Sequence, residues 1–301
     1  MSRRLRLDAE LVRRGLARSR DQAAELIAAG RVEVGGTAAA KAATQVAVDA
    51  AITVRQEESE PGYVSRGGHK LAGALAAFGG LSVAGRRCLD AGASTGGFTD
   101  VLLGAGAAEV VAVDVGYGQL AWSLRNDLRV TVLDRVNVRG LRPEQVAPPP
   151  GVVTADLSFI SLTLVLPALV DCAAPDADFV LMVKPQFEVG KGNVGSGGVV
   201  RDPALRQSAV AAVAAAAADL GLGVLGVTPS PLPGPSGNVE YFLWLRRGAP
   251  ALDEAALRQA IEAGPHGASR RGAASPGLRS EERATREGDA TRRPAGERGQ
   301  Q

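Results

Sequence analysis

RCLDAGASTGGF, at residues 87–98, joins a short apolar run to a glycine-rich loop. The run predicts a strand, and the loop predicts the entry into a helix. Glycine allows backbone conformations and close approaches to a ligand that other residues resist, so Gly92, Gly96 and Gly97 suit a nucleotide-binding loop. Such a loop is weak evidence by itself, because dinucleotide-binding folds have one too. The spacing here, Gly-x-Ser-x-Gly-Gly, differs from the Gly-x-Gly-x-x-Gly of those folds.

Three acidic residues stand at the ends of three successive predicted strands: Asp90, Asp114 after VVAV, and Asp134 after VTVL. In a doubly wound sheet Asp114 would lie beside the glycine loop, where it can accept hydrogen bonds from both ribose hydroxyls of an adenosine. Asp90 is placed as in methyltransferases that hold the methionine part of S-adenosylmethionine, and Asp134 and Asn137 would flank the adenine. Structural glycines in a tight turn would not explain these acids. The predicted S-adenosylmethionine site comprises Asp90, Gly92, Ser94, Thr95, Gly96, Gly97, Phe98, Asp114, Asp134 and Asn137.

Strand-like apolar runs alternate with helical patterns from about residue 63 to 247. VVTADLSF at 152–159 and FVLMVKPQF at 179–187 predict a fourth and a fifth strand, and NVEYFLWL at 238–245 predicts a later one. This alternation is typical of an α/β fold with a largely parallel sheet. We therefore predict a Rossmann-like methyltransferase sheet with helices on both faces, preceded by a small α+β domain.

Four charged residues stand near the predicted ligand edge of that sheet. Asp156 and Lys184 end the fourth and fifth strands, Glu240 lies at the start of the later strand, and Lys70 begins the helix before the first strand. Ligands of open α/β sheets bind outside the carboxyl ends of the strands, so Asp156 and Lys184 should face one crevice. A solvated lysine and a surface glutamate are the alternatives for each residue alone. Methyl transfer to a hydroxyl needs a group that takes or steers its proton, and a lysine held by carboxylates can do so.

The first 60 residues differ from the rest in composition and pattern, and they are basic at their start. Helical spacing predicts one helix over 7–15 and a second from Ser19 to Gly30, followed by strands at 32–34 and 51–54. Arginines dominate the polar positions of both helices and could contact RNA phosphates, although a solvated basic face is the alternative. The predicted RNA-contacting residues are Arg4, Arg6, Arg14, Arg18 and Arg20.

Composition shifts mark the expected boundaries. QEESEPG at 56–62 predicts a linker, and the Gly-, Arg- and Ser-rich stretch from about 264 cannot bury enough apolar surface to order itself. We predict an RNA-binding domain with its linker at 1–60, a methyltransferase domain at 61–249, and a short helical extension with a disordered tail at 250–301. The glycine-rich segment 190–198 predicts either a mobile lid or a plain long connection.

The overall composition restricts the class of protein. Two cysteines and two histidines give neither a disulfide framework nor a metal site, so we expect no metal. The apolar stretch at 209–227 is interrupted by Asp219 and three glycines, which argues against a membrane span. We expect a cytoplasmic protein that does not act at a membrane. A net charge of +2 does not by itself indicate nucleic acid, and the sequence does not predict the oligomeric state.

The motifs together resemble a known family. YVSRGGHKL, LDAGASTGGFTDVLL, AVDVGYGQLAW, ADLSFISLTLVLP and MVKPQFEVGKG closely resemble the TlyA-type haemolysin and rRNA methyltransferase family, and LIAAGRVEVGG resembles the alpha-L, or S4-type, RNA-binding domain. In order and strand position Lys70, Asp156, Lys184 and Glu240 match the Lys-Asp-Lys-Glu tetrad of FtsJ-like ribose 2′-O-methyltransferases. The resemblance implies methylation of a cytidine ribose in 16S or 23S rRNA, or in both, with Lys184 handling the proton.

The resemblance leaves two other classes of function open. A haemolysin or membrane-acting protein is one, because the family includes that name, but no amphipathic helix with a large apolar face supports it. A non-catalytic RNA-binding factor for ribosome assembly is the other, and the complete tetrad argues against it. One segment departs from the family pattern: Pro61-Gly62-Tyr63-Val64 stands where an Arg-x-Trp-Val-like joint is expected. The ribosomal subunit that is modified is therefore not predicted.

Overall fold

The computed structural model describes residues 4–17, 20–47, 50–54 and 62–264. Within the first three ranges, two short helices pack on small sheets around a core that includes Leu7, Leu11, Ile27 and Val32. The predicted helices and strands are present, and Gly15 and Gly30 end the helices at positive φ, as glycine readily does. The elements are β1 (Arg4–Arg6), α1 (Leu7–Arg13), α2 (Arg20–Ala28), β2 (Val32–Val34), β3 (Thr37–Ala38), β4 (Gln45–Ala47) and β5 (Ile52–Val54).

Residues 62–264 form a seven-stranded, mostly parallel sheet with the order β11-β12-β10-β9-β6-β7-β8. Strand β12 is antiparallel to both of its neighbours, whereas the other pairs are parallel. The α/β architecture predicted from the sequence is thus confirmed. The strands are β6 (Arg87–Ala91), β7 (Glu109–Asp114), β8 (Val130–Asp134), β9 (Val152–Ala155), β10 (Asp178–Val183), β11 (Leu222–Pro229) and β12 (Tyr241–Arg247).

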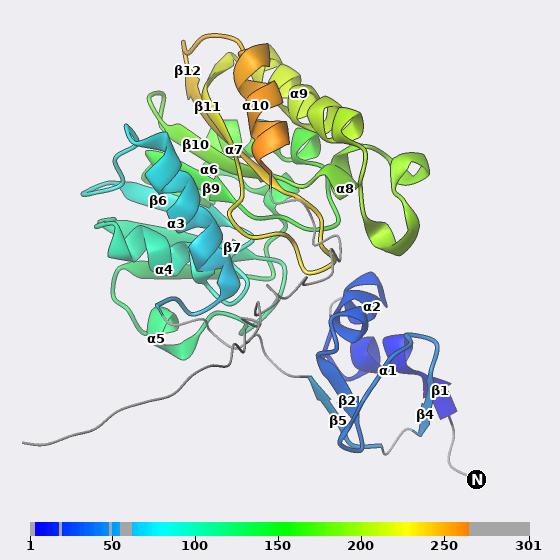
Figure 1. The fold of residues 1–301 in the computed structure, drawn as a ribbon. Coiled ribbons are helices and arrows are strands. Elements are labelled where there is room, and N and C mark those ends of the chain that lie inside the picture. Colours follow the sequence, from blue (N-terminus) through cyan, green and yellow to red (C-terminus); the bar gives the residue numbers. More distant parts are fainter. Residues whose placement is uncertain (1–3, 18–19, 48–49, 55–61, 265–301) are drawn as a thin grey trace, which may run out of the picture. The chain divides into compact units, whose positions relative to one another are not determined.

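Helices cover both faces of this sheet (Figure 1). Helices α3 and α4 pack on one face around Leu71 and Phe78, and α7, α9 and α10 pack on the other face with Leu169 and Val213. Successive strand residues point to opposite faces, so neighbours such as Cys88 and Leu89 enter different cores. The helices are α3 (Arg66–Phe78), α4 (Gly97–Gly104), α5 (Trp122–Arg125), α6 (Pro143–Val146), α7 (Leu166–Cys172), α8 (Pro185–Glu188), α9 (Pro203–Asp219) and α10 (Glu254–Ala263).

Several local expectations differ from the structure. Strand β12 begins at Tyr241, so Glu240 comes just before the strand rather than within it. The glycine-rich segment 190–198 forms two short 3₁₀ turns, Lys191–Asn193 and Ser196–Gly198. Arg18, Ser19 and the predicted linker up to Pro61 lie outside the described residues, as does the chain after residue 264.

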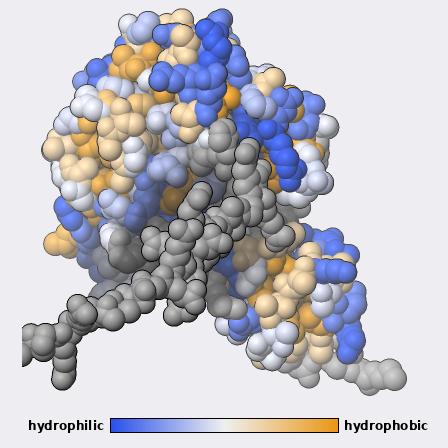
Figure 2. Space-filling view, in the orientation of Figure 1, coloured by the Kyte–Doolittle hydropathy of each residue, from blue (hydrophilic) through white to orange (hydrophobic). Residues whose placement is uncertain are grey.

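The hydropathy of the surface and of the helices bears on whether a segment of the chain could span a membrane. Figure 2 shows hydrophobic and hydrophilic residues intermixed over the side that faces the reader. Over the described part of the chain, no helix combines the length and hydropathy that crossing a bilayer requires.

Candidate active site

The four predicted catalytic residues line one pocket at the carboxyl ends of the parallel strands. Asp156 follows β9 and Lys184 follows β10, and these strands are neighbours in the sheet. Lys70 projects from the second turn of α3, and Glu240 immediately precedes β12. Parallel strands bring their ends to the same edge, so segments far apart in the sequence converge here. We call this cavity, which is also lined by Ser158 and Gln186, the lysine pocket.

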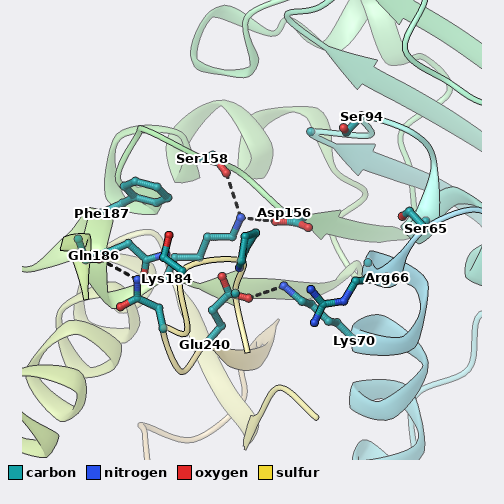
Figure 3. Close-up of a pocket in the computed structure, with 18 of the residues that line it drawn as sticks. Ser65, Arg66, Lys70, Ser94, Asp156, Ser158, Lys184, Gln186, Phe187 and Glu240 are labelled. Carbon is teal, nitrogen blue, oxygen red and sulfur yellow. Dashed lines mark hydrogen bonds and ion pairs between the residues drawn. The ribbon is translucent and has the colours of Figure 1, made fainter. Parts of the chain in front are cut away.

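The charged groups form two ion pairs (Figure 3). Lys70 Nζ lies 2.7 Å from Glu240 Oε2, and Lys184 Nζ lies 2.6 Å from Asp156 Oδ1. Lys70, Lys184 and Glu240 are all at least nine-tenths buried. A buried charge lowers stability unless an opposite charge pairs with it. Each lysine is therefore held in the direction of its carboxylate partner. A lysine with a fixed direction at the edge of a pocket can transfer a proton to or from a ligand there.

A second pocket, of about 340 Å³, adjoins the first and shares Asp156, Ser158 and Lys184 with it. It is bounded by the glycine loop at Gly92 and Ser94 and by Asp114, so we call it the Asp114 pocket. The Asp114 carboxylate accepts hydrogen bonds from the backbone N–H groups of Ser94, at 2.9 Å, and Gly116, at 2.7 Å. A carboxylate oxygen has two lone pairs, so an oxygen that accepts one N–H can also accept from a ligand hydroxyl. Backbone N–H groups of the glycine loop and of the segment after β7 thus orient this carboxylate.

Position 92 of this loop requires glycine. Its φ is +89°, and a Cβ at this position would lie 2.5 Å from the carbonyl oxygen of Asp156. The backbone of Asp156 is itself held by a hydrogen bond from its N–H to the oxygen of Ala91, at 3.0 Å. The glycine loop and the backbone of Asp156 are therefore packed directly against each other. The chemistry of these groups, a buried acid beside a glycine cradle, fits the adenosine part of S-adenosylmethionine.

Residues 63–247 match the model of the FtsJ-like methyltransferases, and residues 5–52 match that of the S4 domain. The chain belongs to the FtsJ-like methyltransferase family. It is 65% identical over 271 residues to the 16S/23S rRNA (cytidine-2′-O)-methyltransferase TlyA of Mycobacterium tuberculosis, a match that covers 88% of this chain and all of that protein. The resemblance to TlyA-type proteins inferred from the sequence is confirmed.

Two further relatives have been named for haemolysis. Hemolysin A of Brachyspira hyodysenteriae is 39% identical over 239 residues, covering 79% of this chain and 98% of that protein. A solved structure of a protein from Streptococcus thermophilus, also named as a hemolysin, is 37% identical with a TM-score of 0.64 and covers 87% of this chain and 96% of the other. The fold described above is therefore also the fold of this solved relative.

The predicted cofactor residues of this FtsJ-like methyltransferase do not all reach a pocket. Gly92, Ser94, Thr95, Gly97, Phe98, Asp114 and Asn137 line one or both of the two pockets. Asp90, Gly96 and Asp134 line neither of them.

Asp90 is fully buried beneath the loop, where it accepts a hydrogen bond from Thr99 Oγ1 at 2.7 Å. Burial raises the pKa of its carboxyl to about 7. Asp134 forms an ion pair with Arg125 at 2.8 Å. Asp90 and Asp134 therefore stabilise the segments around the Asp114 pocket without lining it.

Several polar residues of the lysine pocket were not in the sequence prediction, such as Ser65, Arg66 and Asn238. Three further unpredicted residues, Ser158, Gln186 and Glu188, closely follow Asp156 or Lys184 in sequence, and Glu188 lines neither pocket. Ser158 accepts a hydrogen bond from Lys184 Nζ at 3.1 Å. Gln186 lines the lysine pocket, and among the residues that the structure describes no donor lies within hydrogen-bonding distance of its buried Oε1. Glu188 accepts hydrogen bonds from Ser161 Oγ, at 2.5 Å, and the Leu162 N–H, at 2.9 Å. Their proximity to Lys184 in sequence, or to Asp156, was the only signal available.

The arginines of the S4 domain are organised by two buried acids that the sequence analysis did not single out, Asp8 and Glu10. Arg6 and Arg20 pair with Asp8 at 2.8 and 3.0 Å, and Arg14 pairs with Glu10 at 2.7 Å. Hydrogen bonds from Arg13 and Arg14 lower the pKa of Glu10 to about 2.

The exposed fractions of these arginine side chains divide them into two groups. Arg6 and Arg20 remain 45% and 58% exposed, whereas Arg14, at 22%, also donates to the oxygen of Ala50 and is mainly structural. Arg4 is exposed, and Arg18 lies outside the described residues.

Proposed function

We propose that this chain transfers a methyl group from S-adenosylmethionine to the ribose 2′-hydroxyl of a cytidine in ribosomal RNA. The strongest structural support is Lys184, held 2.6 Å from Asp156 at the junction of the lysine pocket and the Asp114 pocket. Membership of the FtsJ-like family and the 65% identity to a cytidine-2′-O-methyltransferase support the same reaction. A non-catalytic assembly factor would not require this paired arrangement.

The residues divide the work of the reaction between them. S-adenosylmethionine supplies an electrophilic methyl on its sulfonium sulfur. A ribose hydroxyl is a weak nucleophile near neutral pH, so catalysis requires in-line positioning and an acceptor for its proton. In this proposal Lys184 takes that proton, and Asp156 orients Lys184. The Lys70–Glu240 pair borders the lysine pocket, where the ribose binds.

Different residues would bind the donor and the RNA. We propose that Gly92, Ser94 and Asp114 hold the adenosine end of the donor in the Asp114 pocket. The exposed arginines of the S4 domain, such as Arg6 and Arg20, bind rRNA phosphates, which makes binding dependent on salt. Because ribosomal subunits are cytoplasmic, this substrate implies that the protein acts in the cytoplasm. The hemolysin names of two relatives describe those proteins, and no described feature of this chain favours a membrane activity.

A methyl-transfer assay tests the proposal. Purified protein and tritiated S-adenosylmethionine are incubated with 30S or 50S subunits that lack ribose methylation, and the label is mapped by nucleoside analysis. The expected product is 2′-O-methylcytidine, formed by the wild type and not by Lys184→Ala. Label found only on bases would refute the assignment to ribose.

A further inference from the structure

Lys184 Nζ contacts two residues of the segment that follows β9 (Figure 3). Asp156 Oδ1 lies 2.6 Å from it as an ion-pair partner, and Ser158 Oγ accepts a hydrogen bond from it at 3.1 Å. The two residues are two positions apart, and both line the lysine pocket and the Asp114 pocket. The lysine therefore has an anionic partner and a neutral hydrogen-bond acceptor at the boundary between the two pockets.

The hydrogen bond to Ser158 matters because a lysine exchanges one N–H donor for a lone pair when it loses a proton. A charged lysine has three N–H donors, but the neutral amine that can act as a base has two N–H bonds and one lone pair. The Ser158 hydroxyl accepts one N–H and so sets the rotation of the amine about its Cε–Nζ bond, while the Asp156 carboxylate attracts the second N–H as an ion-pair partner. The lone pair then takes the remaining tetrahedral direction. Without the Ser158 hydroxyl, the amine could turn about this bond and point its lone pair elsewhere.

We propose that Ser158 is a positioning residue for methyl transfer: its hydroxyl fixes the direction of the Lys184 lone pair toward the substrate hydroxyl. This inference rests on the proposed function. Ser158 has no charge, so its removal changes the direction of Lys184 without removing a charge from the site. The effect should therefore fall on the chemical step rather than on the binding of donor or RNA.

The segment that contains Ser158 is itself fixed to the segment after Lys184. Glu188, at the end of α8, accepts hydrogen bonds from Ser161 Oγ and the Leu162 N–H at 2.5 and 2.9 Å. The ring of Phe159 packs against Phe187, with centroids 5.3 Å apart. These contacts join residues 159–162 to residues 187–188, the segments that directly follow Ser158 and Lys184. The distance between the hydroxyl and the amine is thus set by the fold, as positioning requires.

The test compares three substitutions at one position. Ser158→Ala removes the acceptor, Ser158→Cys keeps most of the volume but offers a poor acceptor, and Ser158→Thr keeps the hydroxyl. Ser208→Ala, on the exposed face of α9, is the matched control. For each protein we would measure the single-turnover rate constant at saturating donor and rRNA subunit, the dissociation constants of both, and thermal unfolding.

We expect Ser158→Ala and Ser158→Cys to lower the rate constant about 10-fold, which corresponds to one misdirected hydrogen bond at the reacting group. Both dissociation constants should stay within about 2-fold, and Ser158→Thr should recover most of the rate. An unchanged rate in Ser158→Cys, or a loss confined to binding, would overturn the inference. If Ser158→Ala does not fold, the Cys and Thr variants decide between these outcomes. A wild type that forms no 2′-O-methylcytidine would instead contradict the proposed function.

Discussion

Strand β10 has a buried charge cluster at each end, and the two clusters differ in chemistry. At its start, Asp178 is fully buried and is held by Arg86 at 2.6 Å, Arg246 at 2.7 Å and Trp244 Nε1 at 2.7 Å. After its end, Lys184 pairs with Asp156 and borders two pockets. Arginine stays protonated in proteins, whereas lysine can give up its proton. Burial of charge is common to both clusters, so it is the lysine and the adjoining pockets that indicate catalysis.

The pKa of Asp178 fits a structural role for the cluster at the start of β10. Burial alone would raise the pKa of Asp178, but hydrogen bonds from Arg246, Arg86 and Trp244 lower it overall. The acid is therefore ionised in the fold at all ordinary pH values, and the cluster joins β10 and β12 to the segment before β6. A site with one fixed protonation state can stabilise a sheet but cannot relay a proton.

The largest expected effect is on catalysis, from Lys184→Ala. Loss of a positioned proton acceptor typically costs about 10²–10⁴-fold in rate, so single-turnover methyl transfer should fall by about 1,000-fold. Because Lys184 is not needed to join the strands, circular dichroism and thermal unfolding should show a folded protein. Retention of more than about a tenth of the rate would indicate that another group takes the proton.

Asp178→Asn should produce the opposite result. The substitution removes the buried charge that accepts hydrogen bonds from Arg86, Arg246 and Trp244. Because the two arginines are partly exposed to solvent, we expect the free energy of unfolding to fall by about 2 kcal/mol. Urea denaturation measures this loss directly. The exposed pair Arg258–Glu254, separated by 3.6 Å on α10, provides a control, since Glu254→Gln should change stability by less than about 0.5 kcal/mol.

Asp90 and Asp178 should respond to pH in opposite directions. The pKa of Asp90 is raised to about 7 by burial, so its contribution to stability is complete below the ordinary value of 3.8 and is lost as pH rises through 7. The pKa of Asp178 is lowered, so its contribution is present above 3.8 and is lost on acidification. Asp90→Asn should therefore flatten the decline in thermal stability between pH 4 and 7. An unchanged pH profile would contradict a buried, neutral Asp90.

The smallest effect is expected in the S4 domain. Arg20→Ala should weaken rRNA binding about 5-fold and reduce the salt dependence of the binding constant by about one phosphate contact. Arg13 is similarly exposed, at 52%, and pairs with Glu10, so Arg13→Ala serves as the control for a lost ion pair. Equal losses in the two variants would show that the arginines act through domain stability. Filter binding at several salt concentrations would distinguish the cases.

The sequence predicted the sheet from local patterns, and the resemblance to FtsJ-like enzymes selected the four charged residues that the structure brings to one pocket. Apolar runs gave the strands, and the acid or lysine after each run gave the edge where Asp156 and Lys184 meet. The patterns could not show how far each acid lies from the strand end: Asp90 pairs with Ala112, two residues before Asp114, and only Asp114 reaches a pocket. Ser158 was not predicted, because an uncharged hydroxyl after a strand carries no signal in the sequence that it contacts Lys184.

One paired measurement tests the division between the two ends of β10 most directly. The single-turnover rate constant for 2′-O-methylcytidine formation and the free energy of unfolding are measured on the same preparations of Lys184→Ala and Asp178→Asn. We predict a rate loss with near-native stability for the first variant, and a stability loss with a near-native rate for its folded fraction in the second. A Lys184→Ala protein that methylates normally, or an Asp178→Asn protein that is stable but inactive, would contradict this account.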